Sequence, residues 1–338
     1  MRVRQTSRLH QILSAVALTG WLLGCAGCQG YFREGQSRRH LEAGRHYVAS
    51  DDLALALTEL NEAIRIDPKL ATAHHQIGKI HRRRGEYEKA VPPFEQAVKL
   101  DPLGFEYAFD LGQTYRLTKR FPDAVRAYLH ACDLKPDSFE AHMDVGVCYH
   151  QLNRLEEAAT YYNKALALNP DHAGVHANIG VVYDSQGKYY EAIRAYKNSL
   201  ERDATRPVVL VNLATTYLKQ KRFRLAEIAL SKAVEMDPHL SMAHERLGHA
   251  LYRQEKYEQA IDSYERAITL NPRDGVAHAG LGVVWMTQYL ADASQTALRQ
   301  RAIEHWHRSL ELKPNQPELR RLLAKYQPAV VARAPLAP

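Results

Sequence analysis

The sequence has little cysteine, only a small excess of charge of one sign, and no apolar run long enough to span a membrane comfortably. Four of its 338 residues are cysteine, and Cys132 and Cys148 alone lie beyond residue 28. That is too few for the disulfide framework of a small exported domain. The net charge is +7, and loss of Arg2, Arg4 and Arg8 with an N-terminal signal leaves 7 − 3 = +4. This mild basic excess is not a nucleic-acid-binding pattern, so we expect no nucleic acid among the partners.

Motifs of self-contained enzymes are also missing. The sequence contains no GxxxxGK[ST], GxSxG or HExxH. It therefore does not predict the phosphate-binding loop, the nucleophile elbow or the zinc-binding helix that those motifs build. We expect no catalytic residue, no cofactor and no metal, and a chain that is not an enzyme.

The first 24 residues have the three parts of an export signal. Basic residues come first, and residues 12–24 then run thirteen positions without a charge. This length matches the apolar region of a signal peptide, about 7 to 15 residues, and falls short of the roughly 20 that cross a membrane. We expect residues 1–24 to be removed and the mature protein to be exported.

Two cysteines close this segment in the stretch WLLGCAGCQG. Leu22 lies three residues before Cys25, and Gly24 directly precedes it. The stretch resembles the lipobox of bacterial lipoproteins, which implies lipidation at Cys25, a tether over residues 25–36 and a membrane-anchored protein on the periplasmic side of the cell envelope. Lipidation at Cys28 and simple secretion remain alternatives. A redox or metal-binding CxxC is not expected, because no strand accompanies it.

Prolines recur along the chain at a fixed spacing. They stand, each after Asp, Lys or Asn, at Pro68, Pro102, Pro136, Pro170, Pro238 and Pro272, so that the period is 102 − 68 = 34 and one position, between 170 and 238, is skipped. Pro314 follows Pro272 at a longer interval, 314 − 272 = 42, which is one period plus an insertion of eight. A fixed period of this length predicts a solenoid of stacked helical hairpins rather than separate compact domains.

Two helical patterns alternate within each repeat. The first contains a Gly with an aromatic residue three positions later, as in Gly146 and Tyr149. The second contains an Ala, a large residue four positions later and a small residue three after that, as in Ala158, Tyr162 and Ala165. Steps of three and four place each set on one helix face. Gly and Ala remove bulk where the helices cross, aromatic rings fill the remaining space, and Pro ends the second helix.

These columns resemble those of the tetratricopeptide repeat (TPR). The resemblance covers residues 37–316 and implies an all-α fold, an α-α superhelix of eight helix-turn-helix repeats. The repeats span residues 37–70, 71–104, 105–138, 139–172, 173–206, 207–240, 241–274 and 275–316, the last with the insertion. Ala204 in place of Pro and Ala214 in place of Gly predict looser packing around repeats five and six. Pro92 and Pro93 predict a late start or a kink in the second helix of repeat two.

The C-terminal region departs from the period. The extra residues of repeat eight lie between Trp285 and Ala302, and we expect them to lengthen its helices or the turn. Residues 317–326 have the pattern of a short helix that caps the open end of the solenoid. Residues 327–338 are rich in Pro and Ala and are expected to be disordered.

The histidines and the remaining cysteines are assigned to packing. Six histidines share one column of the repeat: His40, His74, His142, His176, His244 and His278. In the TPR family this column packs between the two helices, and ligands one repeat apart cannot converge on one ion. His305 and His307 point to different faces of a helix. Cys132 and Cys148 fall at different levels of antiparallel helices, which favours two buried, inert thiols.

The TPR resemblance also implies where a partner binds, because the first helices of such repeats line a concave groove. The groove columns are basic in the first three repeats, apolar in the middle and mixed at the end. They comprise Arg45, Lys79, Arg82, Arg83, Arg116, Met143, Val147, His150, Val181, Asp184, Val211, Leu218, Met242, His249, Tyr252, Arg253 and Val276. This lining suits a peptide with an acidic end and apolar anchors. Packing between neighbouring helices is the alternative for Val147, Val181 and Val211.

Two asparagines, Asn178 and Asn212, fall in the column that some family members use to hold a peptide backbone. The carboxylate clamp of chaperone-binding members also needs a Lys and an Asn one repeat earlier, and this chain has neither there. We therefore do not expect a chaperone tail as the ligand.

Together these expectations describe a non-catalytic scaffold or adaptor. It is anchored to the bacterial cell envelope by a lipid and binds a protein or peptide segment, in the assembly of pili, outer-membrane proteins or the peptidoglycan machinery. The alternative is the substrate-recruiting arm of a separately encoded enzyme, such as a glycosyltransferase.

Overall fold

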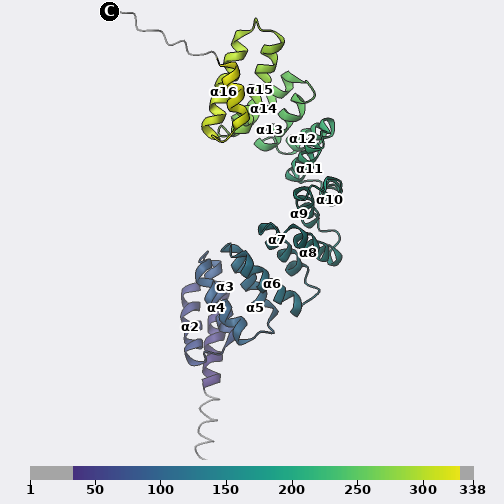
Figure 1. Ribbon diagram of the computed structural model, residues 1–338. Helices are drawn as coiled ribbons and strands as arrows, with labels where there is room; N and C mark the ends of the chain where they lie inside the picture. Colours follow the sequence, from purple (N-terminus) through teal and green to yellow (C-terminus); the bar gives the residue numbers. More distant parts are fainter. Residues whose placement is uncertain (1–32, 328–338) are drawn as a thin grey trace, which may run out of the picture. The chain divides into compact units, whose positions relative to one another are not determined.

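The computed structural model describes residues 33–327, and every regular element in that range is a helix (Figure 1). The all-α prediction is therefore confirmed. The predicted signal, Cys25 and Cys28, and residues 328–338 of the tail lie outside the described residues. Within residues 33–327, no helix combines the length and the apolar character that crossing a membrane requires.

The helices follow one another as the two helices of successive repeats. The first covers residues 33–49, beginning four residues before the predicted start of repeat one. The others are α2 (Leu53–Ile66), α3 (Ala71–Arg83), α4 (Tyr87–Leu100), α5 (Phe105–Leu117), α6 (Phe121–Leu134), α7 (Phe139–Gln151), α8 (Leu155–Leu168), α9 (Ala173–Ser185), α10 (Tyr189–Arg202), α11 (Pro207–Lys219), α12 (Phe223–Met236), α13 (Ser241–Tyr252), α14 (Tyr257–Leu270), α15 (Gly275–Ala291), α16 (Thr296–Leu312) and α17 (Pro317–Tyr326).

The chain divides into two compact halves. The N-terminal half ends at Leu168 with α8, and the C-terminal half begins at Asn169 and continues through α9 to α17. Each half has cores of its own, for example the cluster around Leu60 and Ile77 in the N-terminal half and the cluster around Leu213 and Leu230 in the C-terminal half.

The glycine column marks where the two helices of a repeat cross. A Cβ atom on Gly146 would lie 2.7 Å from Cδ1 of Tyr162, and one on Gly180 would lie 2.6 Å from Cε1 of Tyr196. Real Cβ atoms do not approach a neighbour this closely, so only glycine leaves room for the ring. Both tyrosines are almost fully buried. The sequence predicts the close crossing, and the structure shows that the glycine faces the aromatic ring of the second helix.

Repeat six keeps this crossing closed without a glycine. Ala214 occupies the glycine position, and the position of the ring is taken by the smaller Leu230. Both residues have 0% exposed surface. The looser packing expected from Ala214 is therefore not observed, because the added methyl group is matched by a smaller partner.

The second helices end two residues before the repeat proline, as α4 does before Pro102. α10 ends at the equivalent place, Arg202, although Ala204 replaces the proline. There the Asp203 carboxylate accepts hydrogen bonds from the backbone N–H of Thr205 at 3.0 Å and from its hydroxyl at 2.6 Å. The helix end therefore does not depend on proline alone, and local hydrogen bonding maintains it.

Pro92 and Pro93 lie inside α4, which begins at Tyr87. The late start considered from the sequence is therefore not observed. Neither proline can donate a backbone hydrogen bond, so the carbonyls of Glu88 and Lys89 lack their helical partners. Both of these residues are exposed.

Both helices of repeat eight are longer than every helix from α2 to α14. α15 and α16 have 17 residues each, whereas α13 and α14 have 12 and 14. α17 then covers the end of this repeat, with Leu319 6% exposed and the ring of Tyr326 6.4 Å from that of Trp306. The insertion therefore extends the helices of one hairpin.

Candidate partner-binding surface

In the N-terminal half, charged side chains connect the first helices of neighbouring repeats. Asp110 on α5 accepts a hydrogen bond from His75 Nε2 at 2.7 Å and one from Arg82 Nη1 at 2.8 Å, both from α3. One repeat further on, Arg116 Nε of α5 lies 3.8 Å from Asp144 Oδ1 of α7. The predicted groove arginines therefore serve partly as links between repeats.

The two aspartates occupy the same position of successive repeats and have opposite pKa shifts. Burial opposes ionisation of Asp110, but the hydrogen bonds from His75 and Arg82 outweigh it and lower its pKa. For Asp144 burial dominates, Arg116 offsets only part of it, and the pKa is raised. Hydrogen-bond geometry accounts for the difference, because Asp110 has two close donors. Sequence reasoning missed both residues, although the column they share with Asn178 and Asn212 was a usable signal.

Most of the predicted basic residues in repeats one to three are already paired. Arg45 pairs with Glu42 at 2.9 Å and Arg83 with Asp51 at 2.9 Å. Lys79 is exposed and makes no ion pair within residues 33–327. The charge left for a partner is therefore much smaller than the count of arginines suggests.

Lys79 lies at a cavity of about 470 Å³ between the first helix and α3, which we call the N-terminal cavity. Its lining combines aliphatic side chains with cations: Val48, Leu53, Gln76, Lys79, Ile80, Arg82 and Arg83. The volume lies within the range of pockets that bind small ligands or single side chains. The structure thus brings three of the predicted groove residues together at one hollow.

The apolar middle of the predicted groove is only partly exposed. In the N-terminal half, Met143, Val147 and His150 on α7 are half-buried, and burial lowers the pKa of His150. In the C-terminal half, Val181 on α9 is half-buried, whereas Val211 on α11 has 0% exposed surface. Val211 is therefore corrected from a groove residue to a core residue, in the same cluster as Leu210 and Ala243.

In the C-terminal half, Asp184 of the predicted groove has partners within the chain. Asp184 on α9 accepts a hydrogen bond from the Thr216 hydroxyl at 2.9 Å and pairs with Lys219, both on α11. Three other predicted residues, Asn178, Asn212 and Leu218, are half-buried. Asp184 is thus a link between repeats, as Asp110 is in the other half.

The last predicted set lies on α13. The Tyr252 hydroxyl is 3.3 Å from the Thr287 hydroxyl, and the Arg253 guanidinium stacks on Phe223 at 4.3 Å. Burial, followed by Arg253 and Arg246, lowers the pKa of His249. Met242 and Val276 remain 39% and 44% exposed at the starts of α13 and α15.

The histidine column forms a repeated hydrogen bond. Nε2 of His142 donates to the carbonyl of Pro136 at 2.9 Å, and His176 makes the same bond to Pro170 at 2.8 Å. Because Nε2 carries the proton, Nδ1 of neutral His142 is an acceptor, and it lies 3.5 Å from Sγ of Cys132. These two histidines fasten the turns before α7 and α9. Within residues 33–327, no three His, Cys, Asp or Glu side chains are grouped to hold a metal ion.

Cys132 and Cys148 are buried, free thiols. Burial raises the pKa of Cys132 to about 11 and that of Cys148 to about 12. Since the thiolate is the reactive form, both side chains behave as inert core residues.

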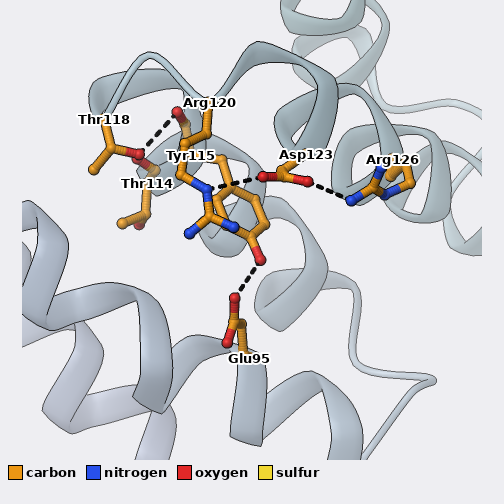
Figure 2. Close-up of polar contacts among 7 residues, drawn as sticks. All are labelled: Glu95, Thr114, Tyr115, Thr118, Arg120, Asp123 and Arg126. Atoms are coloured by element: carbon orange, nitrogen blue, oxygen red, sulfur yellow. Dashed lines mark hydrogen bonds and ion pairs between the residues drawn. The ribbon is translucent and has the colours of Figure 1, made fainter.

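The turns between the helices of a repeat also have dense polar contacts, as Figure 2 shows for α5 and α6. The Tyr115 hydroxyl donates to Glu95 Oε1 at 2.5 Å, and burial together with Glu95 raises the pKa of Tyr115. Arg120 covers the Tyr115 ring at 4.4 Å and donates to Asp123 at 2.8 Å. These groups bond to one another, so we assign the turn a role in stabilising the fold.

Comparison with known families gives one match. The model described as the cilia and flagella-associated protein 70 C-terminal domain matches residues 49–281, more than half of the chain. A comparison with curated proteins gives no match.

Solved structures share the fold. The Cut9–Hcn1 hetero-tetramer of APC/C aligns with a TM-score of 0.57 and 18% identity over 81% of this chain and 52% of that one, so this chain spans about half of its length. A tetratricopeptide repeat protein from Parabacteroides merdae aligns with a TM-score of 0.53 and 18% identity over 74% and 99% of the two chains. PilF from Pseudomonas aeruginosa gives 0.50 and 19% over 63% and 97%. Identities this low show the fold, a TPR solenoid, and no more.

Proposed function

Since the chain belongs to the family of the cilia and flagella-associated protein 70 C-terminal domain, and TPR folds of this type are generally protein-interaction scaffolds, we propose that it is a non-catalytic adaptor. Its N-terminal cavity takes an acidic residue and a neighbouring apolar side chain of a protein partner. The sequence of residues 1–28 supports a lipid anchor at Cys25 and a place in the bacterial cell envelope.

One observation carries the proposal of the N-terminal cavity. Lys79 is the exposed cation there without an ion pair among residues 33–327, and it adjoins the aliphatic side chains of Val48, Leu53 and Ile80. A carboxylate of the partner would pair with Lys79, and an apolar side chain would cover the aliphatic wall. The paired arginines keep the lining in position rather than binding the partner themselves.

The test compares capture of partners from solubilised envelopes by three proteins. Lys79→Glu reverses the unpaired charge, and Lys99→Glu, at an exposed position of α4, is the matched control. We expect a partner that the unchanged chain and Lys99→Glu capture and Lys79→Glu loses, with all three proteins equally helical by circular dichroism. Equal capture by all three would rule out the N-terminal cavity.

The anchor has a separate test. We expect Cys25→Ala to abolish incorporation of radiolabelled fatty acid and to leave the precursor unprocessed or soluble. Label that persists in Cys25→Ala and disappears in Cys28→Ala would move the anchor to Cys28.

A further inference from the structure

A pocket lies beside the longer helices of repeat eight, where the insertion departs from the regular repeat. The added turns of α15 and α16 extend this hairpin, and a cavity of about 540 Å³ opens beside them and the start of α14. We call it the hairpin pocket. It is lined by Tyr257, Glu258, Ile261, Trp285, Thr287, Gln288, Ala291, Asp292, Gln295, Leu298 and Arg301.

The walls of the hairpin pocket are largely aromatic and aliphatic. Trp285 is 7% exposed and belongs to the core cluster, which Tyr257, Ile261 and Leu298 join as half-buried neighbours. Its indole Nε1 is buried without a hydrogen-bond partner. A firmly held aromatic wall with adjoining aliphatic side chains suits an apolar side chain of a ligand.

The acidic residues of the pocket are engaged by donors within the chain. Asp292 Oδ1 accepts from the Ser294 hydroxyl at 2.6 Å and backbone N–H at 3.1 Å, and Asp292 Oδ2 accepts from Gln295 at 2.8 Å. Hydrogen bonds from Ser294 and Gln295 lower the pKa of Asp292. Glu258 accepts from the Gln288 amide at 2.6 Å. Both oxygens of Asp292 thus help to close the turn, and one oxygen of Glu258 joins α14 to α15.

Arg301 is the charged side chain of the pocket that is left without a polar partner among residues 33–327. Its guanidinium lies over the Trp285 ring, 4.5 Å from the centroid, and the side chain is exposed. Stacking holds the guanidinium plane and leaves its N–H edge available for a planar, two-point bond to a carboxylate. The Arg301 guanidinium is therefore the charged group of this pocket whose hydrogen-bonding atoms have no partner among the described residues.

We propose that the hairpin pocket is a second binding site of this chain, which recognises an acidic residue next to a large apolar residue in a protein segment. The carboxylate pairs with Arg301, and the apolar side chain packs between Trp285, Ile261 and Leu298. This site lies in the C-terminal half and does not depend on the N-terminal cavity. It gives the insertion of repeat eight a role in binding.

The test uses the full chain with 5-fluorotryptophan, whose fluorine resonances report Trp21, Trp285 and Trp306 separately. The probes are the acetylated, amidated dipeptides Leu-Glu, Leu-Gln and Leu-Lys. We expect Leu-Glu to shift the Trp285 line and to leave the line of the 1%-exposed Trp306 unchanged. Leu-Gln should bind at least about tenfold more weakly, since it lacks the charge that a two-point arginine bond uses, and Leu-Lys should not bind.

Arg301→Gln is expected to weaken Leu-Glu binding by about tenfold or more. The matched control is Arg308→Gln, an exposed arginine of the same helix that pairs with Glu311 at 2.8 Å. Tighter binding of Leu-Lys, equal binding by Arg301→Gln, or no shift of Trp285 up to about 10 mM of any probe, a limit for even very weak binding, would each overturn the proposal.

Discussion

At the scale of single residues, an aspartate at one position of the repeat stabilises the fold in one repeat when ionised and weakens it in the next. Asp110 has two close donors and a lowered pKa, whereas Asp144, its equivalent in the next repeat, has Arg116 at 3.8 Å and a raised pKa. A lowered pKa means that the ionised group stabilises the fold above about pH 4 and loses that effect as the pH falls through the folded value. A raised pKa means the reverse, so ionisation of Asp144 weakens the fold as the pH rises above about 4.

Replacing each aspartate with asparagine tests this contrast. At pH 7 we expect Asp110→Asn to lower the free energy of unfolding by on the order of 3 kcal/mol, because it breaks a buried pair. Asp144→Asn is expected to raise the free energy of unfolding, because it removes a carboxylate whose burial is only partly offset by Arg116. Denaturant unfolding between pH 3 and 8 should show both differences shrinking below about pH 4. Equal effects of the two substitutions at pH 7 would contradict the roles that we assign to these carboxyl groups.

The glycine column supports a second prediction at this scale. Gly146→Leu must displace the buried Tyr162 ring, and we expect a loss of about 1 to 3 kcal/mol of stability. Gly35→Leu is the matched control, because a Cβ at Gly35 has nothing within 4 Å. Thermal melts of both variants check this, and an unchanged melting temperature for Gly146→Leu would place the crossing elsewhere.

The sequence predicted the role of a residue where the repeat pattern sets that role. It failed where the role depends on which side chains of other helices lie beside the residue. The glycine positions recur in phase, so their crossing was predictable. The burial of Val211 depends on the side chains around it, because Met143, two repeats earlier at the same position, remains half-buried. The pairing of Arg82 with Asp110 depends on two helices whose registry the pattern of charges alone does not give.

At the scale of elements, the turn between the two helices of a repeat has one residue in the left-handed region. The series recurs once in each of the first seven repeats and comprises Asp51, Gly85, Lys119, Asn153, Gly187, Lys221 and Glu255. Within residues 33–327 repeat eight has no such residue, because Tyr289, at the equivalent position, lies inside the extended α15. The sequence placed the insertion correctly, but it left open whether the helices or the turn would lengthen, since its residues are compatible with both.

Glycine at one of these turns is expected to stabilise the protein. Lys221 has φ of 58°, which costs an L-residue about 1–2 kcal/mol, whereas glycine adopts it freely but loses about 0.5–1 kcal/mol more entropy on folding. The net expectation for Lys221→Gly is a gain of about 0.5–1 kcal/mol. The converse substitution, Gly187→Ala at φ 73°, should destabilise. A lower melting temperature for Lys221→Gly would show that the lysine side chain contributes more than its backbone strain costs.

At the scale of the whole molecule, the described chain behaves as two compact halves with separate cores. The C-terminal half contains four repeats and the α17 cap, which exceeds the three or so repeats that a solenoid needs for stability. Its core clusters, around Leu213 and around Trp306, are formed by residues of that half alone. Folding of such arrays depends on contacts between neighbouring repeats rather than on distant ones.

We therefore expect a fragment of residues 169–327 to fold without the N-terminal half. Circular dichroism should show a helical spectrum and a cooperative melt, because every repeat of the fragment except the first retains both neighbours or its cap. The hairpin pocket lies wholly within this fragment, so its Trp285 line should move with the acetylated Leu-Glu probe as in the full chain. An unfolded fragment would contradict this prediction. It would mean that the first repeat of this half, α9 and α10, needs the preceding repeat to stay folded.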